Sequence, residues 1–154
     1  MRNNLSFQKS VKALSDFPKI VILVVVGIAL PLVLIPIVQI AGFTEMIEES
    51  AKAIIVLFLI LNFPTTRQKI LAGISFGFLF GLSENIFYLS NIFQLGNFSI
   101  FWQRFLWTVP MHIITVLIMV FAGLARKWFL IFGLAGAIVL HILFNGIVVE
   151  LLMR

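Results

Sequence analysis

The chain has 154 residues, of which 62% are apolar and only 11% are charged, and its formal net charge is +5. A soluble domain typically carries about a quarter charged residues, so the composition excludes a water-facing globule, a disordered tail, a coiled coil and a nucleic-acid-binding domain. The absence of cysteine excludes disulfides, thiolate metal sites and a cysteine nucleophile. We therefore predict a multi-pass protein of the cell membrane.

Five stretches are long and apolar enough to cross a hydrocarbon core about 30 Å thick, which takes roughly 20 helical residues. In chain order they are residues 20–40, 45–63, 70–93, 105–125 and 128–149. The predicted fold is all-α, a polytopic transmembrane helical bundle. We divide the chain into a basic cytoplasmic segment, 1–19, and a single transmembrane helical domain, 20–154. Residues 5–17 are compatible with a short amphipathic helix that Pro18 ends.

The basic residues indicate how the spans are oriented. They precede the first span and join the second to the third and the fourth to the fifth: Arg2, Lys9, Lys12, Lys19, Arg67, Lys69, Arg126 and Lys127. The alternate loops, 41–44 and 94–100, contain no lysine or arginine. Because basic residues are retained on the cytoplasmic side, the N-terminus is predicted to be cytoplasmic and the C-terminus outside.

Polar side chains inside membrane spans are costly, and each is therefore a functional hypothesis. At the start of the second span, Glu45, Glu48, Glu49 and Lys52 fall on one helical face. Glu48 and Lys52 have the i,i+4 spacing of a helical ion pair. A polar helix start at the lipid headgroups, with Lys52 extending outward, would explain the same pattern.

Two later spans combine a stripe of small residues with polar groups. The rows are Gly73, Gly77, Gly81 and Glu84 in the third span and Gly133, Ala137, His141 and Asn145 in the fifth. Small residues at four-residue spacing let another helix approach closely, so Glu84 and His141 are expected to face protein. A buried structural carboxyl and a satisfied interhelical histidine would explain each of them taken alone.

The fourth span carries His112 shortly after Pro110. Trp102 and Trp107 are typical of the outer membrane interface, and Arg104 beside them is compatible with a side chain that reaches the headgroups. At about 1.5 Å per residue from the cytoplasmic ends, the polar groups of four spans converge in the outer half of the bilayer.

The converging groups permit general acid/base hydrolysis without a serine or cysteine nucleophile. They comprise two adjacent carboxylates, a third carboxylate, two histidines and an amide, and the last two types can stabilise an oxyanion. The same carboxylates and histidines are ordinary zinc ligands, although the sequence has no HExxH motif. We predict no required cofactor and leave a divalent metal open.

Four motifs then appear in chain order: EESAK at 48–52, FGLSEN at 80–85, R…PMH at 104–112 and HILFN at 141–145. They resemble the EExxK, FxxxEN and HxxxN signatures of the PrsW family of intramembrane proteases, which is related to the CAAX prenyl endopeptidases and bacteriocin-processing membrane enzymes. The resemblance implies a glutamate-dependent intramembrane endopeptidase. By position, Glu48 would be the general base, supported by Glu49 and Lys52, and His141 with Asn145 would supply the oxyanion site.

The candidate catalytic residues are Glu48, Glu49, Glu84, His112, His141 and Asn145, with Lys52, Asn85 and Arg104 in support. The resemblance implies the lipid bilayer and a membrane-anchored substrate as partners, such as an anti-sigma factor that is cut near the outer side. Only one span precedes the EE motif, fewer than in relatives, and a homodimer that supplies missing walls is compatible with this.

Two other classes of function stay open. One is a small proton-coupled transporter that uses Glu84 and the histidines, although the halves of the chain show no inverted repeat. The other is a non-catalytic membrane partner that uses the polar pocket only for binding.

Overall fold

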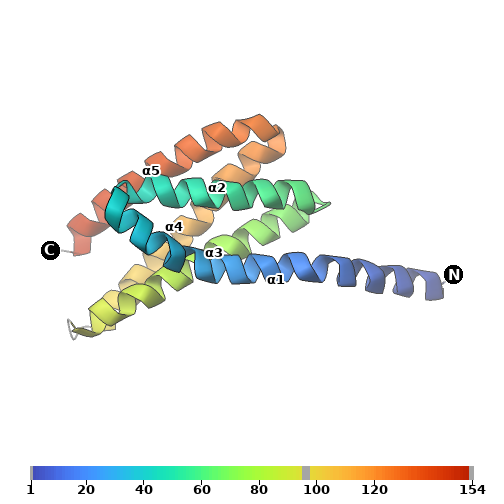
Figure 1. The fold of residues 1–154 in the computed structure, drawn as a ribbon, viewed down its shortest axis with the longest axis horizontal. Coiled ribbons are helices and arrows are strands. Elements are labelled where there is room, and N and C mark those ends of the chain that lie inside the picture. The colour runs from blue at the N-terminus through green and yellow to red at the C-terminus, as the bar shows by residue number, and fades with distance from the viewer. Residues whose placement is uncertain (1, 95–97, 153–154) are drawn as a thin grey trace.

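The computed structural model describes residues 2–94 and 98–152 of the chain. Within these residues the regular structure is helical throughout. Its elements are α1 (Arg2–Ala41), α2 (Thr44–Asn62), α3 (Thr66–Gln94), α4 (Phe98–Ala125), the short 3-10 helix η1 (Lys127–Phe129) and α5 (Leu130–Leu152). Figure 1 shows α1 and α5 on opposite sides of the bundle, with α2 beside α5. The predicted all-α helical bundle is confirmed.

In the part of the chain that the structure describes, four segments are long and apolar enough to cross a membrane: Phe17–Ala41, Thr66–Leu89, Phe101–Ala125 and Lys127–Ile147. The remaining helix, α2, has 19 residues and carries several charged side chains in its first half. Its apolar second half belongs to the core, where Val56 and Leu59 are fully buried. The charged half of α2 also packs inside the bundle, as described below. The chain is a multi-pass membrane protein.

Helix α1 is longer than predicted. The expected end at Pro18 is wrong, because the helix runs from Arg2 to Ala41 with Pro18, Pro31 and Pro36 inside it. Proline removes one backbone hydrogen bond and kinks a helix, which membrane helices tolerate. The last turns of α1 bend away from the rest of the helix and lead into α2 (Figure 1).

Helices α3 and α4 form the most extensive helix pair of the bundle, and glycine makes this contact possible. A Cβ atom on Gly77 would lie 2.8 Å from the Cα of Ile113 and 2.9 Å from the backbone oxygen of His112. These distances are too short for real carbon contacts, so α4 lies this close only because position 77 has no side chain. The predicted close-packing face of α3 is therefore confirmed, and it places Glu84, two turns further on, beside α4.

Helix α5 packs on α4 in the same way. A Cβ atom on Gly133 would lie 3.0 Å from the Cα of Met119, and Ala137 is fully buried. The row continues to His141 and Asn145, which reach α2. The small residues thus let α3 and α5 pack closely on α4. The polar residues that follow these rows, Glu84 in α3 and His141 with Asn145 in α5, are thereby brought inside the bundle.

The α3–α4 contact gives a first prediction. We expect Gly77→Ala to lower the free energy of unfolding in detergent micelles by about 1–3 kcal/mol, because the added methyl group meets backbone that cannot move aside. Gly136→Ala is the control, since its added Cβ would lie 3.7 Å from the Ile118 side chain, at ordinary contact distance. Equal stability of the two variants would contradict the close approach.

Candidate active site

The polar residues predicted from four separate spans lie together inside the bundle. They are Glu45, Glu48, Glu49 and Lys52 of α2, Glu84 and Asn85 of α3, Arg104 and His112 of α4, and His141 and Asn145 of α5. Glu49, Lys52, Asn85 and His112 are fully buried. Four helices therefore contribute to one polar cluster, enclosed by an otherwise apolar bundle.

Lys52 lies at the centre of this cluster. Its Nζ donates a hydrogen bond to Glu49 Oε1 at 2.7 Å, lies 2.7 Å from His112 Nδ1, and sits 4.2 Å from the centre of the Phe80 ring. The interpretation in which Lys52 extends to the headgroups is thus wrong. The expected i,i+4 pair with Glu48 is also wrong, because Lys52 and Glu49 both face α4 and α5 whereas Glu48 lines a cavity.

Glu84 is held from two directions by α4. One of its carboxylate oxygens bonds His112 Nε2, and the other lies 3.8 Å from the Arg104 guanidinium. That guanidinium also covers the Tyr88 ring at 4.3 Å, and its side chain is only 26% exposed. Arg104 therefore contacts the cluster, in which the motifs had placed it as a supporting residue, rather than extending to the headgroups. An ammonium only donates, so His112 Nδ1 accepts from Lys52 and Nε2–H donates to Glu84.

Helix α5 holds the first turns of α2. His141 Nδ1 lies 2.7 Å from Glu49 Oε1, and Asn145 Nδ2 donates to Glu45 Oε1 at 2.9 Å. Glu45 was not among the candidate site residues, although its place on the charged face of α2 could have indicated it. A continuous chain of polar contacts therefore connects Arg104, Glu84, His112, Lys52, Glu49 and His141.

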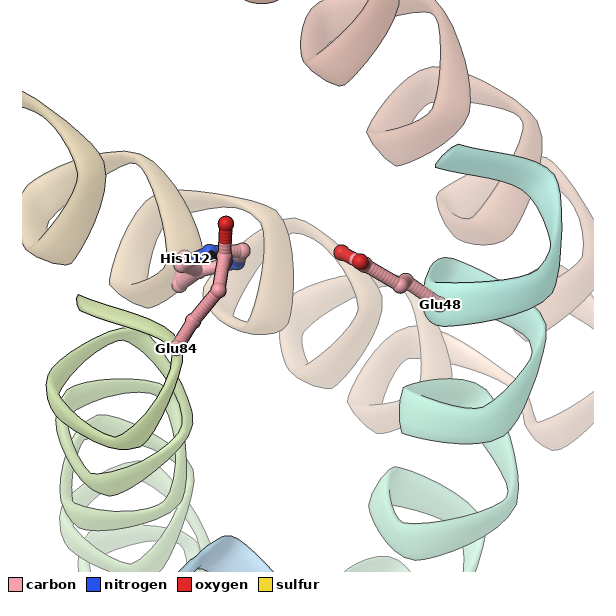
Figure 2. Close-up of side chains that lie close together, drawn as sticks. All are labelled: Glu48, Glu84 and His112. Atoms are coloured by element: carbon pink, nitrogen blue, oxygen red, sulfur yellow. Dashed lines mark hydrogen bonds and ion pairs between the residues drawn. The ribbon is translucent and has the colours of Figure 1, made fainter. Parts of the chain in front are cut away.

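Glu48 and Glu49 each have a buried carboxylate oxygen, Oε2, without a hydrogen-bond partner among the described residues, but of the two only Glu48 lines a cavity. Figure 2 shows Glu48 and Glu84 directed toward His112 from two different helices. One donor atom from each of these three residues lies within 4.8 Å of the others. Two carboxylates and one imidazole at this spacing form a set of donors that can hold a water molecule or a divalent cation.

A cavity of about 270 Å³ opens onto Glu48 and Glu84. Its other walls come from the last turns of α1 and from α3, including Val38 and Tyr88. Glu49 and His141 are not among its lining residues. The sequence did not indicate that α1 takes part, because the apolar residues of a span look alike whether they face lipid or a pocket.

Asn85 makes no hydrogen bond with the other predicted site residues among the described contacts. It is fully buried, and its Nδ2 donates to the Gly81 backbone oxygen in the same helix at 3.0 Å. Its Oδ1 has no hydrogen-bond partner among the described residues. The contact that Asn85 makes is therefore local to α3.

Fold and site together define a polytopic membrane protein with a buried carboxylate–histidine centre next to a cavity. The family model described as PrsW family intramembrane metalloprotease matches residues 17–153, nearly the whole chain. The chain therefore belongs to the PrsW family, as its motifs indicated, and this favours a membrane peptidase over the transporter and non-catalytic alternatives. No curated protein and no solved structure matches the chain.

The buried ion pair gives a second prediction. We expect Lys52→Met to destabilise the folded bundle by about 3–5 kcal/mol, because it leaves the buried Glu49 carboxylate without its cation. The measurement is the free energy of unfolding in detergent micelles. Lys127→Met, at an exposed position, is the control and should unfold like wild type.

The double variant Lys52→Met/Glu49→Gln removes both charges and should recover part of the lost stability. A Lys52→Met protein as stable as wild type would show that the cluster does not depend on this pair.

Proposed function

We propose that the chain is an intramembrane endopeptidase in which Glu48, Glu84 and His112 hold and activate the water that attacks a peptide bond. The observation that carries this proposal is the convergence of one donor atom each from Glu48, Glu84 and His112 within 4.8 Å, beside a cavity that Glu48 and Glu84 line. A carboxylate with a free lone pair, buried among polar groups, is suited to accept a proton from water.

Within the EE pair, the contacts favour Glu48 as the general base. Glu49 Oε1 is already bound by Lys52 and His141, so Glu49 is engaged in holding α2, α4 and α5 together. Glu48 lines the cavity, where a substrate would meet it. We assign Glu49 and Lys52 the role of positioning Glu48 and His112.

The Glu84–His112 pair is suited to passing a proton to the leaving amine. His112 is held by Lys52 at Nδ1 and by Glu84 at Nε2, so its ring is fixed in orientation. Arg104 beside Glu84 favours the charged carboxylate. The oxyanion role that the resemblance implies for His141 and Asn145 stays a prediction, since the polar contacts described for them are to Glu49 and Glu45.

Charge balance supports one further cation or proton at the site. The connected chain, together with Glu48, contains three carboxylates, Glu48, Glu49 and Glu84, against two fixed cations, Lys52 and Arg104. An uncompensated charge inside a membrane-embedded bundle is costly. The excess carboxylate lies where donor atoms of Glu48, Glu84 and His112 come within 4.8 Å of one another (Figure 2).

The family description implies a metal, and the residues fit one. Glu48, Glu84 and His112 would hold it, because their donor atoms converge and Glu48 has a free buried oxygen. His112 would ligate through Nε2 only as the other neutral tautomer, with its proton on Nδ1 instead of on the nitrogen that faces Glu84. A bound divalent metal supplies Lewis-acid polarisation of a carbonyl and lowers the pKa of a bound water.

The substrate we propose is a membrane-anchored protein, such as an anti-sigma factor, that is cut near the outer side of the membrane. Glu48 lies in the first turns of α2, and the opposite end of α2 leads to Arg67 and Lys69. Because basic loops remain cytoplasmic, the site then lies toward the outer leaflet, with the N-terminus inside and the C-terminus outside.

The direct test of this function is co-expression with candidate single-span membrane proteins, followed by detection of shortened products. We expect wild type to shorten a substrate and Glu48→Gln to reduce cleavage about 10²- to 10⁴-fold, the range typical for loss of a general base. Asp16→Asn, the same carboxyl-to-amide change at a position that precedes the first membrane-spanning segment, Phe17–Ala41, is the control and should cleave like wild type. A Glu48→Gln protein that cuts as well as wild type would refute the assignment.

Metal removal separates two versions of the chemistry. We expect purified protein treated with a strong chelator to lose cleavage and to regain it with Zn²⁺, and we expect Glu84→Gln to retain less metal by elemental analysis. Full cleavage after complete stripping would instead favour the metal-free, glutamate-activated version predicted from the sequence.

A further inference from the structure

The cavity beside the site results from the way α1 separates from α3. The two helices are in close contact before Pro31, where a Cβ atom on Gly27 would lie 2.9 Å from Leu79 Cβ. One turn of α3 later, Ser83 Oγ donates to the Ile28 backbone oxygen at 2.6 Å. From Pro31 onward, α1 instead lines the cavity.

Two prolines explain why α1 separates from α3 from Pro31 onward. Pro31 and Pro36 each lack the backbone N–H that would continue the helical hydrogen bonds, and a proline ring forces a kink. The last turns of α1 accordingly bend toward α2 (Figure 1). The cavity therefore lies between α3 and the bent end of α1, and the start of α2 forms its third side.

The walls of this cavity have a definite chemical character. On the α1 side, Ile35 and Val38 present apolar side chains, and Gln39 with Thr44 adds an amide and a hydroxyl. At about 270 Å³ the cavity is slightly smaller than pockets for drug-sized ligands, which span about 300–1,000 Å³. It has room for one or two residues of an extended chain but not for a second helix.

We propose that this cavity is the specificity pocket of the enzyme, that it receives one apolar substrate side chain next to the scissile bond, and that Ile35 and Val38 set its size limit. The inference rests on the proposed peptidase function. An apolar side chain would contact Ile35 and Val38 while its own peptide bond lies toward Glu48 and Glu84. A substrate segment unwound within the membrane also needs hydrogen-bond partners for its backbone, which Gln39 and Thr44 offer.

The test compares substrates of different size with variants of the pocket wall. The probes are single-span reporter proteins that differ only in carrying Ala, Leu or Phe at each position near the outer end of the span, with the cleavage site mapped by mass spectrometry. At the selected position we expect wild type to prefer Leu or Phe over Ala, and Val38→Trp to shift the Phe-to-Ala ratio of kcat/KM toward Ala by at least about tenfold.

Two further variants make this result interpretable. Val38→Ala enlarges the pocket and should shift the ratio toward Phe, which keeps the inference testable if the tryptophan variant fails to fold. Ile37→Trp is the matched control, because Ile37 is 47% exposed, adjacent in sequence and not among the lining residues, and it should leave the ratio unchanged.

The failures can be told apart. Cleavage by wild type with the same ratio in both Val38 variants, or an equal shift in Ile37→Trp, would overturn the pocket assignment and leave the peptidase function standing. Absence of cleavage of every reporter by wild type would instead count against the proposed function, and the pocket would fall with it.

Discussion

The structure depends on one buried cation, the ammonium of Lys52. Inside a membrane-embedded bundle no solvent compensates a charge, so this group must be paired by protein. It contacts Glu49 on its own helix and His112 on α4, and these two residues extend the contacts to His141 on α5 and Glu84 on α3. A single charge thus fixes the relative positions of four helices.

Close backbone packing makes this arrangement possible. Glycines let α3 and α5 approach α4 closely, and this brings the polar side chains of these helices together. The small residues and the polar residues lie on the same helical faces, so packing and chemistry are coupled. Among the described residues, Glu48 and Glu49 each keep one buried carboxylate oxygen without a hydrogen-bond partner, and Glu48 is the one that lies next to the opening made by the bent end of α1.

Much of this could be predicted from the sequence, because polar residues are rare in membrane spans and are easily recognised there. The helices, the small-residue faces and the convergence of the cluster all followed from hydropathy and periodicity. The partner of Lys52 did not, because Glu48 and Glu49 are both within reach on one face and only the positions of α4 and α5 decide between them. The α1 wall was missed because the apolar residues of a span do not reveal whether they face lipid or a pocket.

The central claim is that Glu49 holds the bundle together while Glu48 is kept free to react. The most direct test is the free energy of unfolding of Glu48→Gln and Glu49→Gln, measured side by side in detergent with a chelator present. The account predicts that Glu48→Gln is at least as stable as wild type, because it removes an uncompensated buried charge, and that Glu49→Gln loses about 3–5 kcal/mol, because it leaves Lys52 unpaired. Equal losses, or a larger loss for Glu48→Gln, would contradict it.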